Sequence, residues 1–220
     1  TTETDDETGA TTTRYEDDLG DGTIIERTEL PNGVEIERTT DAEGETTTVV
    51  TDKDGNQTTL EDDQETTREG IDGIAEAIAE GKSIGEIAEQ QGVTREQLTA
   101  QLEAAGFDLV ESSDELNRYS NSIIDTQSGE KIAEYSFTLK TNTTTTRYVS
   151  ADGIETRTTE YGNEGRHTET ITEANGRETT TTEDADGNTT VEVTSNGYTL
   201  TTPPDGNLNL RDNEGGTEIE

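Results

Sequence analysis

The chain has 220 residues, of which 52 are Asp or Glu and 15 are Lys or Arg, so its formal net charge is −37. Hydrophobic residues make up 25%, the mean hydropathy is −0.95, and Cys, Met and Trp are absent. This composition excludes disulfides and zinc–thiolate sites, excludes nucleic acid and anionic membrane as ordinary partners, and leaves no material for a large dry core.

The charge also bears on stability and on location. Self-repulsion opposes compaction, and high salt or divalent cations weaken it, so we expect β-ladder hydrogen bonds, a partner subunit or bound cations to hold the chain together. Cysteine-free, threonine-rich acidic chains are common on cell surfaces, which predicts an extracellular or cell-surface protein. No segment reaches transmembrane length and no signal peptide is present, so no membrane insertion is expected. Because the chain begins with Thr1, it is expected to be a processed protein or a piece of a longer one.

The first 60 residues predict a tail followed by an array of strands. Residues 1–13 have no apolar pattern and are expected to be a polar tail or a donor strand. Residues 14–60 carry turn glycines 11 residues apart, at positions 22, 33, 44 and 55. Asn-Gly and Asp-Gly favour two-residue hairpin turns in which both residues have positive φ. The runs between them alternate β-branched and charged residues, as strands of about seven residues do.

Residues 61–110 are expected to form a polar linker (61–70) and a three-helix insert. Helical spacing gives apolar faces to three short helices, which end at Gly81, Gly92 and Gly106. Ser83 with Glu86, and Thr94 with Gln97, predict capping boxes at the starts of the second and third helices. The predicted buried positions are Ile71, Ile74, Ala75, Ile78, Ile84, Ile87, Ala88, Leu98, Leu102 and Ala105, with Phe107, Leu109 and Val110 in an exit strand.

The segment 83–98 (SIGEIAEQQGVTREQL) resembles a helix-turn-helix, with Gly92 in the turn, and also resembles the helices of a LysM glycan-binding module. The first resemblance implies DNA binding and the second glycan binding. Residues 71–109 hold eight acids and two bases, which opposes contact with phosphates. A structural mini-bundle is the third interpretation, because capped amphipathic helices usually just pack.

Residues 111–204 predict a second β array. Residues 111–117 are expected to be a linker, and the following hairpin is the most apolar in the chain. Its residues Ile123, Ile124, Ile132, Tyr135 and Phe137 are expected to pack against the helices. Turn glycines then recur at 153, 165, 176, 187, 197 and 206, until Pro203-Pro204 ends the array. Residues 205–220 are expected to be a C-terminal tail or strand, and a second candidate donor strand.

The predicted fold class is therefore mainly β: threonine-rich antiparallel β-meander repeats, about 11 residues per strand and turn, flanking a small three-helix insert. A β-solenoid is the alternative. The 45 threonines suit a thin sheet, because threonine fits the pleat, tolerates water and pairs with threonine across strands.

The repeats also resemble those of RHS/YD-repeat proteins. Residues 14–33 (RYEDDLGDGTIIERTELPNG) and 182–193 (TEDADGNTTVEV) carry the likeness, and two 11-residue units match one such repeat in length. The resemblance implies an extracellular β-sheet shell or fibre, often part of a toxin or surface protein. This chain departs from the pattern because most of its units lack the tyrosine.

A DxDGN pattern that occurs twice gives the candidate ligand sites. Calcium takes oxygens from Asp and Asn at positions 1, 3 and 5 of a loop, and both segments begin in that way. Neither has the glycine and glutamate that complete an EF-hand loop, and a hairpin turn favours the same residues. The candidate Ca²⁺ ligands are Asp52, Asp54 and Asn56 in one segment and Asp184, Asp186 and Asn188 in the other.

No enzyme motif appears. His167 is the one histidine, and it has no cysteine or acid pair arranged with it in sequence. Catalytic acids need a dry pocket, which this composition does not favour, so the chain is expected not to be an enzyme. Positions 56–58, 142–144 and 188–190 fit the N-glycosylation sequon, which this much threonine also produces by chance.

The sequence thus predicts a non-enzymatic structural protein of the cell surface or extracellular space. It is expected to assemble into fibres with copies of itself or with a longer parent chain, through β-strand addition at open sheet edges. The alternatives are a surface binding or adhesion module for a glycan or protein, and a shell segment of an RHS-like toxin.

Overall fold

The computed structural model describes residues 1–6, 8–16, 22–60, 68–114, 118–213 and 218–219. Its helices are α1 (Arg68–Ala79), α2 (Ile84–Gln91) and α3 (Arg95–Ala104). The strands before the helices are β1 (Thr2–Thr4), β2 (Thr11–Glu16), β3 (Ile24–Glu29), β4 (Glu35–Thr40), β5 (Thr46–Thr51) and β6 (Gln57–Leu60). Those after them are β7 (Phe107–Ser113), β8 (Arg118–Asp125), β9 (Lys131–Thr138), β10 (Thr143–Val149), β11 (Glu155–Tyr161), β12 (Arg166–Thr172), β13 (Glu178–Glu183), β14 (Thr189–Ser195), β15 (Tyr198–Thr202), β16 (Asn209–Asp212) and β17 (Glu218–Ile219).

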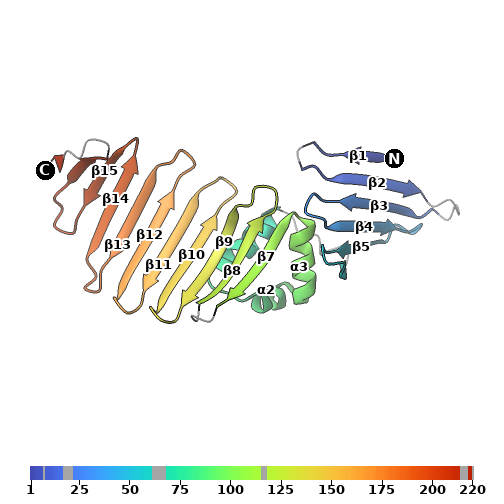
Figure 1. Ribbon diagram of the computed structural model, residues 1–220, viewed down its shortest axis with the longest axis horizontal. Coiled ribbons are helices and arrows are strands. Elements are labelled where there is room, and N and C mark those ends of the chain that lie inside the picture. Colours follow the sequence, from blue (N-terminus) through green and yellow to red (C-terminus); the bar gives the residue numbers. More distant parts are fainter. Residues whose placement is uncertain (7, 17–21, 61–67, 115–117, 214–217, 220) are drawn as a thin grey trace. The chain divides into compact units, whose positions relative to one another are not determined.

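The strands form two sheets in which neighbours in the chain are neighbours in space (Figure 1). Strands β1 to β6 make a six-stranded sheet, here called sheet A, and β7 to β17 make an eleven-stranded sheet, sheet B. Neighbouring strands run antiparallel, for example β4 with β5 and β12 with β13. The mainly-β meander with a three-helix insert is confirmed, and the solenoid alternative is wrong.

Helices α2 and α3 begin at their predicted caps, whereas α1 begins at Arg68, inside the segment predicted as a linker. The Ser83 and Glu86 side chains form a capping box at α2, and Thr94 and Gln97 form one at α3. Gly92 ends α2 with φ of 73°, in the left-handed region that glycine adopts without a steric penalty. These ends are predictable because capping depends on residues only a few positions apart.

Most of the hairpin turns differ from the two-residue type that was predicted. In six of them the first residue donates its N–H to the carbonyl of the fifth, and the glycine in fourth place donates to the carbonyl of the first. This is a three-residue loop, a type I turn followed by a glycine bulge. The six turns span residues 30–34, 41–45, 52–56, 150–154, 173–177 and 184–188.

In these six turns the residue before the glycine does not have positive φ, so the two-residue turn that Asn-Gly and Asp-Gly favour does not form. Among the described residues, the non-glycine residues with positive φ are Asn142 and Asn196. Asn196 precedes Gly197, and Ser195 pairs with Tyr198 on either side of them, so this turn fits the predicted two-residue form.

Three of the segments predicted as tails or linkers contain strands, and residues 61–67 of the other predicted linker lie outside the described residues. Residues 1–13 supply β1 and the start of β2, which pair with each other, so the segment is not a free donor. Glu111–Ser113 continue β7 rather than beginning a linker. Pro203-Pro204 does not end the array, because β16 follows it and pairs with β15.

The chain divides into two compact units. The first comprises Thr1–Ile74, Lys82–Val110 and Ile123–Lys131, and the second comprises Ala75–Gly81, Glu111–Ser122 and Ile132–Glu220. Pieces of the helical insert and of the apolar hairpin belong to each of the two units, and the predicted segment boundaries stay a prediction.

A small apolar core lies in the first unit. On sheet A, Val34, Val50 and Leu60 pack with Ala100 of α3. The helices bury most of the side chains predicted from their spacing, including Ile74, Leu98 and Leu102, each at most 1% exposed. Ala105 was also predicted to be buried, but it caps the end of α3 and is exposed. Small clusters of closely packed side chains on the helices and on sheet A therefore take the place of the large core that the composition excludes.

The second unit contains strands with no second layer. No residue from Leu139 to Asn213, a continuous described stretch, is buried. Threonine hydroxyls hydrogen-bond across its strands, as between Thr170 and Thr180 (3.1 Å) and between Thr194 and Thr199 (2.8 Å). The threonine pairs expected from the sequence are present, and together with the backbone ladder they hold a sheet that has little apolar burial.

Candidate functional site

The predicted calcium ligands lie in hairpin turns, where their side chains hold the turn. One carboxylate oxygen of Asp52 accepts the N–H groups of Asp54 (2.9 Å) and Asn56 (2.8 Å), and the other accepts the Asn56 side-chain amide (2.7 Å). The hydrogen bond from the Asn56 side chain, aided by the backbone donors, holds the pKa of Asp52 below its usual value.

The second DxDGN segment repeats this geometry. Asp184 accepts the N–H groups of Asp186 and Asn188, each at 2.9 Å, and the Asn188 side chain again lowers the pKa of the carboxyl. The structure thus brings each triplet together as a turn, which is the alternative that the sequence left open. In the described part of the chain, no group of three or more His, Asp or Glu side chains is placed to hold a metal ion. Calcium binding stays a prediction.

A hollow of about 660 Å³ lies beside the first of these turns, between β5, β6 and α3. Asp52, Asn56 and Glu103 are among the residues that line it. Burial, followed by the charges of Asp52 and Asp108, raises the pKa of Glu103. Lys53 Nζ lies 3.8 Å from Asp108 Oδ2. This crowding of carboxylates would repel an anion and attract a cation. Sequence reasoning missed Glu103 because only the packing of α3 on sheet A brings it here.

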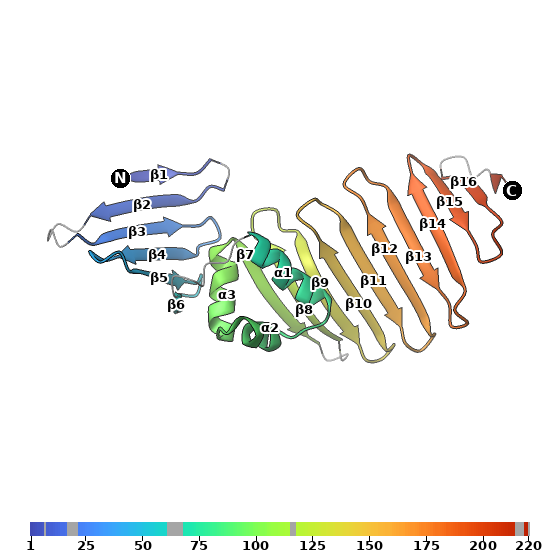
Figure 2. The same cartoon turned by 180° about the vertical axis from the view of Figure 1, so that it is seen from behind.

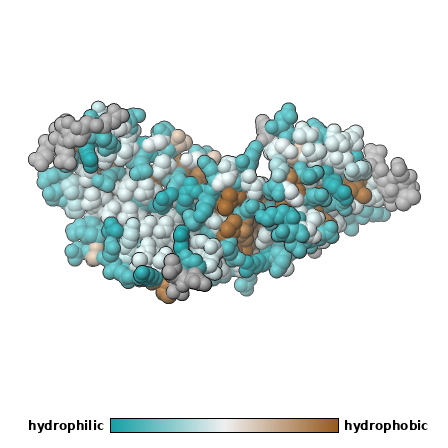
Figure 3. Space-filling view, viewed as in Figure 1, coloured by the Kyte–Doolittle hydropathy of each residue, from teal (hydrophilic) through white to brown (hydrophobic). Residues whose placement is uncertain are grey.

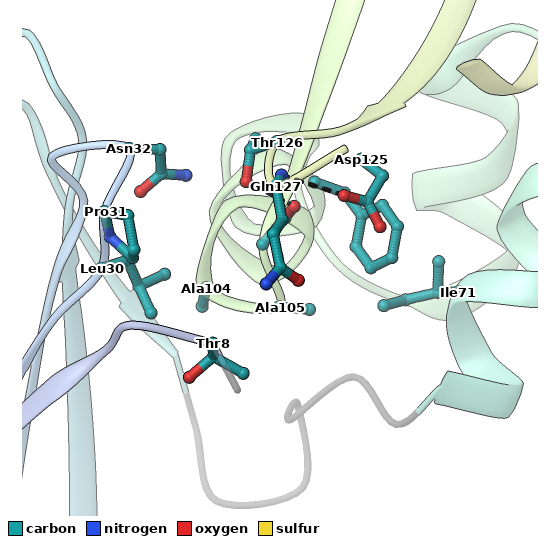
Figure 4. Close-up of a pocket in the computed structure, with 12 residues that line it drawn as sticks. Thr8, Leu30, Pro31, Asn32, Ile71, Ala104, Ala105, Asp125, Thr126 and Gln127 are labelled. Atoms are coloured by element: carbon teal, nitrogen blue, oxygen red, sulfur yellow. Dashed lines mark hydrogen bonds between the residues drawn. The ribbon is translucent and has the colours of Figure 1, made fainter. Parts of the chain in front are cut away.

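A second pocket, of about 470 Å³, also lies in the first unit (Figure 4). Leu30, Pro31 and Asn32 line one side and Ile71 lines another. Its polar groups serve local structure: Asp125 accepts the Gln127 N–H at 2.9 Å, and the Thr126 hydroxyl donates to the Gly106 carbonyl at 2.7 Å. The pocket is therefore mainly an apolar hollow with a polar rim, and it offers no nucleophile paired with a base.

His167 lies on the exposed part of sheet B. Its Nδ1 is 2.8 Å from Glu160 Oε1, and the His167 side chain is 38% exposed. The neighbouring Arg166 lies over the Tyr161 ring, 4.0 Å from the centroid. These are cross-strand contacts of a solvated sheet, and no enclosed cavity among the described pockets includes His167.

The outer edge of sheet A is the feature that bears most directly on assembly. Thr1 and Arg14 exchange both backbone hydrogen bonds, at 2.9 and 2.8 Å, and the Asp5 N–H donates to the Ala10 carbonyl. Because hydrogen-bonded and non-hydrogen-bonded pairs alternate in antiparallel strands, Glu3 faces β2, and the backbone groups of Thr2 and Thr4 point outward. Two N–H and two C=O groups are thus available to another strand.

The opposite edge of sheet A is covered by a helix. Strand β6 is the opposite edge of sheet A, and the Gln97 side chain of α3 donates to the Thr59 carbonyl at 3.4 Å. Helix α3 also packs on Leu60 through Ala100. Cover by a helix is one way in which proteins protect a sheet edge, so β1 is the more accessible edge of sheet A.

Comparison with known proteins gives little. No protein-family model matches the chain, and no curated protein matches it. Among solved structures, it aligns with the TCP10 domain of Danio rerio CPAP in complex with a peptide of Danio rerio STIL. That match has 15% identity, covers 94% of this chain and 98% of that one, and has a TM-score of 0.22. A mutant of AofleA from Arthrobotrys oligospora aligns at 8% identity over 96% of this chain and 81% of that one, with a TM-score of 0.19.

These TM-scores are too low for either likeness to carry an argument about fold or function. Nothing in the comparisons bears on the resemblances to RHS/YD repeats, helix-turn-helix proteins or LysM modules, which stay predictions. Within the described residues, no helix is both long and apolar enough to cross a membrane.

Proposed function

We propose that this is a non-enzymatic structural protein of the extracellular space or cell surface, which acts through its open sheets and assembles by strand addition. The observation that supports this most directly is the outer edge of β1, where Thr2 and Thr4 present unpaired backbone groups. A strand of another copy, or of a longer parent chain, would complete that ladder.

The charge of the chain makes such assembly conditional. Each subunit carries a formal charge of −37, so copies repel one another at low ionic strength. The edge strand is also short, at three residues, and carries Glu3, both of which are features that limit edge-to-edge pairing. Assembly should therefore need molar salt or a divalent cation, which screens the repulsion.

The experiment is light scattering with negative-stain electron microscopy on the full chain, in dilute buffer, in molar sodium chloride and in millimolar calcium chloride. We expect regular oligomers or fibres in the last two conditions. Dispersed monomers in all three would refute the proposal. A calcium response without a sodium chloride response would also support cation sites such as those at Asp52 and Asp184.

A pair of variants locates the interface. Replacing both Thr2 and Thr4 by proline removes the outward N–H donors while leaving the hydrogen bonds between Glu3 and β2 in place, because proline is tolerated on edge strands. The matched control replaces both by valine, which keeps the N–H groups and the β-branched shape. Only the proline variant should lose assembly.

The second candidate is the binding module. The pocket between Leu30, Pro31 and Ile71 favours it, since an apolar hollow with a polar rim is a common form of ligand site. Titration of the full chain with peptidoglycan fragments, followed by NMR at Leu30 and Ile71, tests it. Shifts confined to this pocket would favour the module over the fibre.

A further inference from the structure

The strand register divides the exposed part of sheet B into two chemically different faces. Side chains alternate between faces along a strand, and paired residues share a face. We call the face that carries Tyr135 of β9 the α1 face, and the opposite face the threonine face. The turn after α1 lies against Tyr135, since a Cβ on Gly81 would fall 2.8 Å from its ring. Helix α1 accordingly appears behind the sheet in Figure 1 and in front of it in Figure 2.

A row of mainly apolar residues crosses the α1 face from β10 to β16. The pairing passes it from strand to strand, as in Thr179 with Val193 and Val193 with Leu200. In order, the row consists of Tyr148, Thr156, Ile171, Thr179, Val193, Leu200 and Leu210. Ile171 is 36% exposed, and Leu200 and Leu210 are 37% exposed, so nothing in the described chain covers them.

Charge is divided between the two faces as well. On strands β10 to β16 the α1 face has four carboxylates and no Lys or Arg. The carboxylates are those of Glu160, Glu169, Glu183 and Asp212. Every arginine of these strands, namely Arg147, Arg157, Arg166 and Arg211, lies on the threonine face.

Two of the arginines on the threonine face share an anionic partner there. Arg147 and Arg157 both contact Glu155, at 2.8 and 3.1 Å. The view of Figure 3 has α1 behind the sheet, and the surface of sheet B in it is mainly hydrophilic or intermediate. The apolar row is therefore a property of one face, and Glu169 and Glu183 lie beside it on a face where strands β10 to β16 carry no Lys or Arg.

The chain itself shows how the α1 face is covered. At β9 its covering element is α1 and the turn that follows it. This helix is amphipathic, and its Ala75 and Ile78 are fully buried. The same face continues uncovered from β10 onward, with an apolar row in place and carboxylates beside it.

We propose that the uncovered α1 face of β10–β16 binds an amphipathic helix of another polypeptide, whose apolar stripe is flanked by lysine or arginine. The apolar stripe covers Ile171, Val193, Leu200 and Leu210, and the flanking cations meet Glu169 and Glu183. A second copy of this chain does not fit, because its acidic surface would be repelled by these carboxylates. Seven strands at about 4.8 Å spacing give a row roughly 29 Å long. A helix of about 19 residues spans that length.

The test uses the full chain and a fluorescent 18-residue peptide of leucine and lysine, with the leucines along one helical face. A scrambled peptide of the same composition is the control, since any cationic peptide is attracted to an acidic chain. Fluorescence anisotropy should show the patterned peptide binding at least tenfold more tightly than the scrambled one. Equal binding of the two peptides would overturn the proposal.

Variants on opposite faces complete the test. Glu169→Gln on the α1 face and Glu178→Gln on the threonine face each remove one negative charge, so both lower the general attraction of the chain for a cationic peptide equally. Glu169→Gln should weaken binding further, because it also removes a contact in the proposed site. Likewise Leu200→Ser should weaken binding at least tenfold and Val149→Thr, on the threonine face, should not. Circular dichroism confirms that each variant is folded, and Ile171→Thr replaces Leu200→Ser if that one is not. Equal effects on the two faces would show attraction to overall charge alone and would refute the site.

Discussion

The helical insert with sheet A and the outer strands of sheet B draw their stability from different sources. In the first, isoleucine and leucine side chains such as Ile74 and Leu98 are excluded from water. In the second, from Leu139 to Asn213, every residue keeps some exposure. Hydrogen-bond ladders and cross-strand threonine pairs hold those strands, each contact small and local. The difference teaches that a mutation should act through packing in one region and through turns and ladders in the other.

Truncation of a leucine in each region gives the largest expected contrast. Leu98→Ala, at a fully buried site on α3, should lower the free energy of unfolding by about 2–5 kcal/mol, because it leaves a cavity. Leu200→Ala removes the same atoms from a side chain that is 37% exposed, and should cost only about 0.5–1 kcal/mol. Urea unfolding followed by circular dichroism measures both. Equal losses of unfolding free energy in the two variants would mean that the Leu200 side chain is packed in a core or that the Leu98 side chain is not.

Glycine replacements should have opposite signs in the two regions. Gly176 has φ of 82° and open space around its missing side chain, so Gly176→Ala meets backbone strain alone, roughly 1–2 kcal/mol. Gly85 is inside α2, also with open space, and Gly85→Ala should stabilise the protein by about 0.5–1 kcal/mol. Thermal unfolding of the two variants measures the difference. A stabilising Gly176→Ala would contradict the turn geometry described here.

The helix cap provides a smaller and more local test. Thr94 accepts the N–H of Gln97 at 3.1 Å, so Thr94→Ala should cost about 1 kcal/mol. Serine at this position keeps the acceptor and is the control. Hydrogen exchange should show faster exchange in α3 and unchanged exchange in β12 and β13. Faster exchange in both regions would show that they unfold as one cooperative unit.

How much of this could be predicted depends on how far apart the interacting residues lie. The capping residues Ser83 and Thr94 act over three positions, so the starts of α2 and α3 were predictable to the residue, whereas α1 begins at Arg68, before the predicted Ile71. That threonines pair across strands was also predictable, because a meander places each threonine-rich strand beside the next one in the chain. The turn form was not, because the same three-residue loop forms whether its first residue is Asp52, whose carboxylate accepts the N–H groups two and four residues ahead, or Leu30, which has no such acceptor.

The sites depended on contacts that no local pattern reveals. Glu103 gains its neighbours only when α3 packs on sheet A, which the alternation of β5 and β6 does not indicate. The apolar row was present in the sequence as Ile171, Val193 and Leu200, but its place on one face requires the register of each hairpin. That this face stays open beyond β9 is a property of the whole sheet. Strand alternation predicts which residues share a face, and it does not predict what covers that face.

The smallest expected effects come from titration, and they have opposite signs at the two carboxyl sites. The pKa of Asp184 is lowered, so its contribution to stability is present above its unfolded pKa and is lost as the pH falls through the folded one. The pKa of Glu103 is raised, so its favourable contribution is present below its unfolded pKa and is lost as the pH rises through the folded one. Asp184→Asn should therefore be most destabilising at neutral pH and nearly silent in acid. Glu103→Gln should become more stabilising, relative to the natural chain, as the pH rises from 4 to 7. Urea unfolding at several pH values measures both differences. If both stability differences ran in the same direction with pH, the surroundings of the Glu103 carboxyl in α3 would have to stabilise its ionised form, as those of Asp184 do.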